Sequence, residues 1–252
     1  AVTTPTSTNA PRNLVSTADY YKVDISGGIG TISVDVAGGL CYVDRRPEWC
    51  ALFTRRPEAV GGFNVGTIDT YSSQLQNGTG KRLIEGLDFT ASYMTGLAGI
   101  GLPGSRLSFQ LSYSHLLRSY STPVAGAARR NLKSEMGTPD DPASGSISYE
   151  DDVFGLTVSG NYIPRFYHEQ PFRQSFPLAN GSFIPKEEFR IPPRFYTNMQ
   201  MRFKVSDQYQ LFFGVRNLLN VEPIVPYAGI PGNYYVYDQI GRRFYAGLRL
   251  KM

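Results

Sequence analysis

Long segments of this chain alternate apolar and polar residues with a period of two, which is the pattern of β-strands whose two faces meet different environments. The pattern is clearest over 106–114, where Leu107, Phe109 and Leu111 are separated by polar residues, and it recurs over 195–205 and 243–252. The repeat predicts an all-β antiparallel fold with eight main strands. We expect them near 17–27, 80–95, 106–121, 144–151, 154–169, 193–206, 209–220 and 237–252. A soluble antiparallel sheet also alternates, so the period alone does not identify the compartment.

The connections between these strands alternate in length. Long segments at 27–79, 122–143, 170–193 and 222–236 are separated by short ones at 96–105, 151–153 and 207–208. Long loops at one end and tight turns at the other are typical of transmembrane barrels with extracellular loops and periplasmic turns. Aromatic residues near strand ends, such as Tyr20 and Tyr120, fit interfacial girdles. A soluble β-sandwich is the alternative interpretation.

Composition excludes several other classes. Charged residues are 18% and aromatic residues 13% of the chain, which is unlike a disordered protein. No run approaches the ~18 consecutive apolar residues that a transmembrane helix needs. The net charge of +4 is too small and too dispersed to indicate a nucleic-acid partner.

Four short segments, in this order and spacing, resemble the C-terminal part of a TonB-dependent outer-membrane receptor. They are DYYKVDI at 19–25, IEGLDF at 84–89, FGVRNLLNVEP at 213–223 and GRRFYAGLRLKM at 241–252. The resemblance implies a bacterial outer-membrane location and a barrel of about 22 strands around an N-terminal plug. It also implies uptake of a siderophore, a vitamin or an oligosaccharide, powered by the TonB system.

The resemblance also implies a division of the chain. Residues 15–252 form the C-terminal barrel segment, and 1–14 are a polar N-terminal segment or a cut end, with no plug domain present. We expect the remaining strands and the plug in the same or another chain, TonB acting through that plug, and contact with outer-membrane lipid or lipopolysaccharide. An independent eight-stranded barrel is the alternative. The excess of bases among inward charges such as Arg202, Arg216 and Arg243 favours a wide, hydrated lumen instead.

The sequence supports one leading hypothesis for function and one alternative. The leading hypothesis is active uptake without enzymatic chemistry or a cofactor. The alternative is a structural outer-membrane barrel without active transport, or a passive pore. No Gly-x-Ser-x-Gly nucleophile elbow occurs, and neither His115 nor His168 has an identifiable catalytic neighbour in sequence. Each histidine is either a pH-responsive group or ligand, or a residue without a special role.

The two cysteines, Cys41 and Cys50, lie in the longest predicted loop. Their even number, their close spacing and a cell-surface setting favour a disulfide that stiffens this loop. Two reduced thiols in a cytosolic protein are the alternative. No histidine lies close to them in sequence, which argues against a metal site.

Loop arginines are the candidate ligand contacts, because guanidinium groups beside aromatic rings suit anionic or catechol-like chelates. The candidate residues are Arg45, Arg46, Trp49, Arg129, Arg130 and Arg173. For any single one of these arginines, contact with lipopolysaccharide phosphates, or plain solvation, is the favoured explanation.

The chain ends in a pattern that resembles the last-strand assembly signal of outer-membrane barrels. The residues are Tyr245, Gly247, Leu250 and Met252, with methionine where family members usually end in Phe or Trp.

Overall fold

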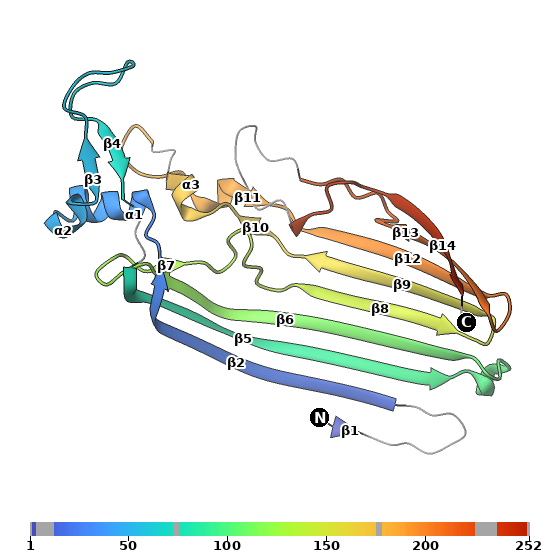
Figure 1. Ribbon diagram of the computed structural model, residues 1–252. Helices are drawn as coiled ribbons and strands as arrows, with labels where there is room; N and C mark the ends of the chain where they lie inside the picture. Colours follow the sequence, from blue (N-terminus) through green and yellow to red (C-terminus); the bar gives the residue numbers. More distant parts are fainter. Residues whose placement is uncertain (1, 4–12, 73–75, 175–177, 225–235, 251–252) are drawn as a thin grey trace. The chain divides into compact units, whose positions relative to one another are not determined.

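The computed structural model describes residues 2–3, 13–72, 76–174, 178–224 and 236–250. Its main feature is a ten-stranded sheet with the order β1-β2-β5-β6-β8-β9-β12-β13-β14, to which β7 adds beside β6 (Figure 1). The long strands are β2 (Asn13–Gly30), β5 (Gln76–Gly96), β6 (Arg106–Thr122), β8 (Ala143–Glu150), β9 (Phe154–Ile163), β12 (Arg194–Lys204), β13 (Tyr209–Arg216) and β14 (Arg243–Leu250). The two short members are β1 (Val2–Thr3) and β7 (Arg130–Asn131). The eight predicted strands are therefore present, in an up-and-down order.

The chain divides into two compact units. The first contains Ala1–Tyr21, Glu85–Leu117 and Lys133–Met252, and the second contains Lys22–Ile84 and Arg118–Leu132. In the second unit, the loop after β2 contains α1 (Val34–Gly38), a π-helical turn η1 (Gly39–Val43), α2 (Pro47–Cys50) and a ribbon of β3 (Phe53–Arg55) and β4 (Ile68–Tyr71). No helix within the described ranges has both the length and the apolar composition to cross a membrane.

Cross-strand register explains the alternation, because apolar residues oppose apolar residues across six strands. One such row passes through Leu107, Tyr149, Leu156, Met201, Phe213 and Ala246. A polar row on the other face passes through Ser108, Ser148, Thr157, Gln200, Gly214 and Tyr245. The sheet thus has one apolar face and one polar face, as the sequence predicts.

Side chains within a short connection can accept hydrogen bonds from its backbone N–H groups, which keeps the turn tight. In the turn after β8, Asp151 Oδ1 accepts hydrogen bonds from the backbone nitrogens of Val153 (2.9 Å) and Phe154 (2.7 Å). These bonds hold the pKa of Asp151 below its ordinary value. The turn chemistry expected at 151–153 is therefore confirmed.

Strand β13 ends at Arg216 rather than at the predicted 220, because two asparagines turn the chain. Asn217 and Asn220 both have left-handed backbone conformations, with φ of 52° and 53°. The Asn217 side chain is fully buried and bonds both backbone groups of Val221, at 2.8 and 2.9 Å. The NLLN motif is therefore a strand terminator.

Two other predicted boundaries are wrong. The strand expected over 154–169 ends at Ile163, since Pro164 follows and the chain leaves to form β10 (Phe166–Tyr167) against β11 (Arg190–Ile191). The last strand begins at Arg243 rather than 237. The remaining short elements of this region are α3 (Gln170–Gln174) and the 3₁₀ turn η3 (Lys186–Phe189), and η2 (Ala98–Ile100) follows β5.

Candidate functional site

The second unit has its own apolar core, which we call the loop-module core. Its buried members are Ile32, Ala37, Leu40, Cys41, Phe53 and Val124. The predicted disulfide is present and joins η1 to α2, with Cys41 and Cys50 Cα atoms 4.9 Å apart. Trp49 and Tyr71 pack against this core, and the Tyr71 hydroxyl donates to the carbonyl of Ile32 at 2.7 Å. The loop is therefore a folded module.

Two of the predicted ligand contacts, Arg46 and Arg129, contact neighbouring residues of this module. Arg46 donates from Nε to Glu48 at 2.9 Å and from Nη1 to the Ala125 carbonyl at 2.9 Å, and its guanidinium carbon lies 5.9 Å from the Trp49 ring centre. Arg129 stacks on Tyr120 at 4.4 Å. These contacts position the arginines, and ligand contact by them stays a prediction.

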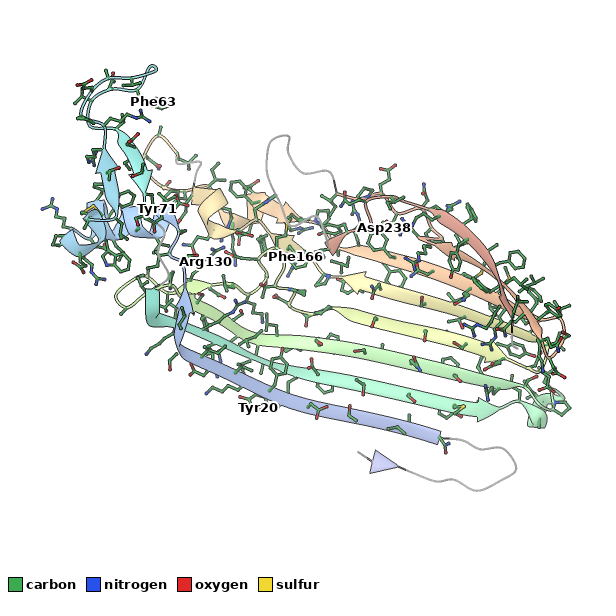
Figure 2. The ribbon with its side chains drawn as sticks, in the orientation of Figure 1. Tyr20, Phe63, Tyr71, Arg130, Phe166 and Asp238 are labelled. Atoms are coloured by element: carbon green, nitrogen blue, oxygen red, sulfur yellow. A yellow bond between two sulfur atoms is a disulfide. The ribbon has the colours of Figure 1, made fainter. Side chains whose placement is uncertain are left out.

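The other predicted arginines lie in different settings. Arg45 is exposed, with a left-handed backbone at φ 54°. Arg130 lies in β7 and pairs with Ser121 of β6 (Figure 2). Arg173 belongs to the first unit, where it pairs with Glu135 at 3.3 Å and donates to the His168 carbonyl at 2.8 Å. Arg173 thus holds α3 within the first unit, whereas the other five candidates belong to the second unit.

A cationic site on the polar face was not among the candidates. Arg216 of β13 lies directly opposite Arg243 of β14. Like charges in this position destabilise a strand pair. Asp238 compensates Arg243 through a contact of 3.0 Å, whereas Arg216 has no ion-pair partner in the part of the chain that the structure describes. The pair leaves an excess positive charge on this face.

Buried phenols border the same site. Tyr196 is 7% exposed and Tyr237 is 3% exposed, and neither hydroxyl has a hydrogen-bond partner within the described ranges. The Tyr196 hydroxyl approaches the backbone of Asp238 without reaching hydrogen-bond geometry. Burial, followed by the neighbouring Tyr196, raises the pKa of Tyr237 to about 12, so this phenol remains a neutral donor.

These phenols belong to a second small core, which we call the polar-face core. Its buried members are Met136, Phe166, Ile191, Tyr196 and Tyr237 (Figure 2 labels Phe166). The segment 236–240 lines one part of an open cavity of about 600 Å³ on the polar face. Besides Tyr196 and Tyr237, its polar lining is Asn161, Asn198, Arg216, Asp238, Gln239, Arg243 and Tyr245. Guanidinium, amide and phenol donors around one cavity suit an anionic or oxygen-rich ligand.

A different charge cluster lies at the other end of these strands. Glu150 accepts hydrogen bonds from Arg106 Nε at 3.0 Å and Nη2 at 2.5 Å, and it also pairs with Arg202. Gly155 lies between Glu150 and Arg202 in the register, and a Cβ there would come within 3.1 Å of the Arg202 guanidinium. The missing side chain lets one carboxylate tie β6 to β12 across β9.

The two histidines lie in different environments. His115 Nδ1 lies 2.5 Å from Asp141 Oδ1, which also accepts from the Tyr113 hydroxyl at 2.7 Å. His168 is buried, packs edge-on against Phe189, and has its pKa lowered by burial although Glu169 opposes the shift. Among the described residues, no three His, Cys, Asp or Glu side chains gather as a metal site.

Three residues of the predicted assembly signal, Tyr245, Gly247 and Leu250, lie in β14, the last strand in the order of the sheet. Tyr245 lies across Gly214 and Phe212 lies across Gly247, so each glycine makes room for a neighbouring ring. Leu250 lies opposite Tyr209, and Met252 is outside the described residues. Recognition of this pattern by assembly machinery stays a prediction.

Comparison with known proteins identifies related folds. Residues 8–218 match the family model described as TonB dependent receptor-like, beta-barrel. A variant of the ferric enterobactin receptor PfeA from Pseudomonas aeruginosa superposes with a TM-score of 0.54 at 15% identity, and the match covers 94% of this chain and 29% of that one. A second PfeA variant, in complex with enterobactin, gives the same values. A comparison with curated proteins finds no match.

Proposed function

Because this chain belongs to the TonB-dependent receptor-like β-barrel family, we propose that it is the C-terminal barrel segment of a receptor that imports an anionic substrate. Family members are outer-membrane transporters rather than enzymes, and the chain forms part of such a barrel. It spans 29% of the length of PfeA. The proposal therefore assigns residues 15–252 to the barrel, and the plug and the remaining strands to another part of the same protein or to a partner chain.

The observation that carries the substrate class is the Arg216–Arg243 pair. Two opposed guanidinium groups with one compensating carboxylate leave a positive site beside a cavity of about 600 Å³. A bound anion would offset the repulsion between the two arginines. Relief of this repulsion would add to the binding free energy of an anion. Ferric siderophores with negative charge fit this chemistry, and one similar receptor structure holds enterobactin.

The binding test uses the full-length receptor with ferric enterobactin as an anionic probe. Arg216→Gln removes the uncompensated charge and keeps a hydrogen-bonding side chain. Loss of a charge-assisted contact, worth roughly 1.5–3 kcal/mol, predicts about 10- to 150-fold weaker binding. Arg249→Gln is the matched control, because Arg249 lies on the same face, in the neighbouring strand β14, opposite Gln210 and outside the cavity.

The outcomes separate the alternatives. Equal affinities for the two variants and for the unaltered receptor would contradict the anionic site. Import is tested separately, by uptake of labelled iron chelate in cells with and without TonB. Uptake that does not change when TonB is removed would instead support a passive pore, and absence of any uptake would support a structural barrel.

A further inference from the structure

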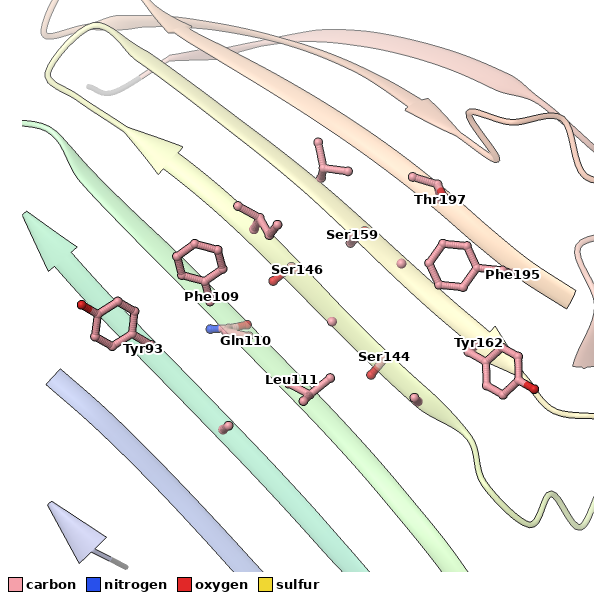
Figure 3. Close-up of a pocket in the computed structure, with 16 residues that line it drawn as sticks. Tyr93, Phe109, Gln110, Leu111, Ser144, Ser146, Ser159, Tyr162, Phe195 and Thr197 are labelled. Carbon is pink, nitrogen blue, oxygen red and sulfur yellow. The ribbon is translucent and has the colours of Figure 1, made fainter. Parts of the chain in front are cut away.

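The two faces of the sheet differ in the charge that lines their hollows. The apolar face contains a groove of about 530 Å³ around rings such as Phe109 and Phe195, and within the described ranges no charged side chain lines it (Figure 3). The cavity on the polar face is lined by two bases, Arg216 and Arg243, and among its described lining residues by a single carboxylate, Asp238. Asp238 is therefore the side chain that most resembles an anionic ligand at this site.

Asp238 is held to Arg243 by one hydrogen bond. Arg243 Nη2 donates to Asp238 Oδ2 at 3.0 Å, and Asp238 Oδ1 accepts from the backbone nitrogen of Ile240 at 3.1 Å (Figure 2 labels Asp238). Asp238 lies in the connection that precedes β14, which begins at Arg243. The carboxylate can therefore leave Arg243 without breaking a hydrogen bond between strands.

Glu150, on the same face, shows how a carboxylate is fixed when its role is structural. It accepts two hydrogen bonds from Arg106, at 3.0 and 2.5 Å, and a third from Arg202. It also belongs to a strand, where it pairs in register with Arg106 and Gly155. Asp238 has neither the second arginine nor the strand pairing, so its ion pair is the more easily exchanged.

Arg216 offers an anion its first contact. It is exposed and, in the part of the chain that the structure describes, has no ion-pair partner, whereas Asp238 occupies the opposite Arg243. The Arg243 side chain is 33% exposed, so a ligand at Arg216 can also reach it. An anionic group that contacts both arginines would lie close to the Asp238 carboxylate, and like charges repel strongly at such short range. The ligand and Asp238 therefore compete for the same guanidinium group.

We propose that Asp238 is an internal competitor for the anionic ligand. In the free receptor its carboxylate occupies Arg243. A ligand that binds first at Arg216 displaces Asp238 and takes its place at Arg243, and the return of Asp238 to Arg243 speeds release of the ligand. This inference rests on the proposed function, because it uses the same two arginines, and it makes Asp238 a residue that limits affinity.

The test measures the affinity and the dissociation rate of ferric enterobactin with the full-length receptor. Asp238→Asn keeps the size of the side chain and removes its charge, so the competitor is lost. We expect about fivefold tighter binding, most of it through slower dissociation. If Asp238 served only to position Arg243, its loss would weaken binding, so the sign of the change separates the two roles.

Asp207→Asn is the matched control. Asp207 pairs with Lys204 at 2.8 Å in the turn before β13, at the other end of that strand from Arg216. The same substitution there should leave the affinity for ferric enterobactin unchanged. Asp238→Glu retains the negative charge and should not reproduce the gain. The gain in Asp238→Asn should also shrink at high ionic strength, because salt screens the repulsion that the aspartate exerts.

Heat-modifiable electrophoretic mobility identifies which variants are folded, and Asp238→Ser, which also removes the charge, serves if Asp238→Asn does not fold. Unchanged or weaker binding by a folded, uncharged variant would overturn the inference, as would an equal gain in Asp207→Asn or Asp238→Glu.

The Arg216→Gln variant separates this inference from the proposed function. Weaker binding by Arg216→Gln without a gain in Asp238→Asn would overturn only the role of Asp238. Unchanged binding by Arg216→Gln would contradict the anionic site itself and, with it, the exchange between ligand and Asp238.

Discussion

The loop-module core and the polar-face core differ in how they are held together. The loop-module core is closed by the Cys41–Cys50 disulfide, and the neighbouring Arg46 is bonded to Glu48 and to the Ala125 carbonyl. The polar-face core has no covalent link among its described residues, contains two tyrosine hydroxyls without partners, and borders the uncompensated Arg216. The disulfide makes the loop-module core rigid, although Trp49 Nε1 beside it also lacks a hydrogen-bond partner within the described ranges. In the polar-face core the unmet hydroxyls lie beside an uncompensated charge, and this combination marks a place for a ligand.

The largest expected effect comes from Phe166→Ala in the polar-face core. Phe166 is fully buried, and loss of a buried phenyl ring costs about 3–5 kcal/mol. We expect faster amide hydrogen exchange in 164–191 and 236–240, together with weaker ligand binding. Phe183→Ala is the control, since Phe183 is 49% exposed in the same long connection. Exchange that stays unchanged in these segments would contradict the assignment of a packed core.

Removal of the disulfide should have a smaller and more local effect. Cys41→Ser with Cys50→Ser frees a loop with a sequence separation of 9, for which the chain-entropy estimate is roughly 2.5–3 kcal/mol. We expect faster exchange and proteolysis within 33–72, and reduction of the unaltered receptor should reproduce it. Equal acceleration in 236–240 would show that the two cores are not independent.

The smallest effect concerns pH. Burial keeps the pKa of His168 below the usual 6.5, so the neutral ring is favoured in the folded state. Its contribution to stability is present above pH 6.5 and is lost as pH falls towards the folded pKa, after which no further loss occurs. Protection factors at 164–191, which correct for the intrinsic pH dependence of amide exchange, should therefore fall between pH 7.5 and 5. In His168→Gln this dependence should weaken, and in His115→Gln it should remain. An unaltered slope in His168→Gln would exclude this histidine as its source.

Much of the sheet could be predicted because alternation depends only on neighbouring residues. The apolar series from Leu107 to Tyr113 needs no knowledge of its partner strands to indicate a two-faced strand. Strand ends were less predictable where tertiary contacts decide them. Asn217 ends β13 through bonds with Val221 and Asn198, and a period of two contains no sign of those bonds.

The candidate site could be predicted only in part. The alternation of apolar and polar residues placed Arg216 and Arg243 on the inner face. That they lie directly opposite one another depends on the register of β13 and β14, which the sequence does not show. The disulfide was predictable because it joins two residues of one loop, whereas the bonds of Arg173 join α3 to residues of other segments.

The most direct test of the account is the accessibility of adjacent residues on β12 in the full-length receptor within native outer membranes. Gln200→Cys places a thiol on the polar face and Met201→Cys places one on the apolar face. A charged, membrane-impermeant thiol reagent should modify the thiol from Gln200→Cys at least tenfold faster than that from Met201→Cys, because only the first faces water. Equal rates, or faster modification at position 201, would contradict a barrel wall with a hydrated polar face and a lipid-covered apolar face.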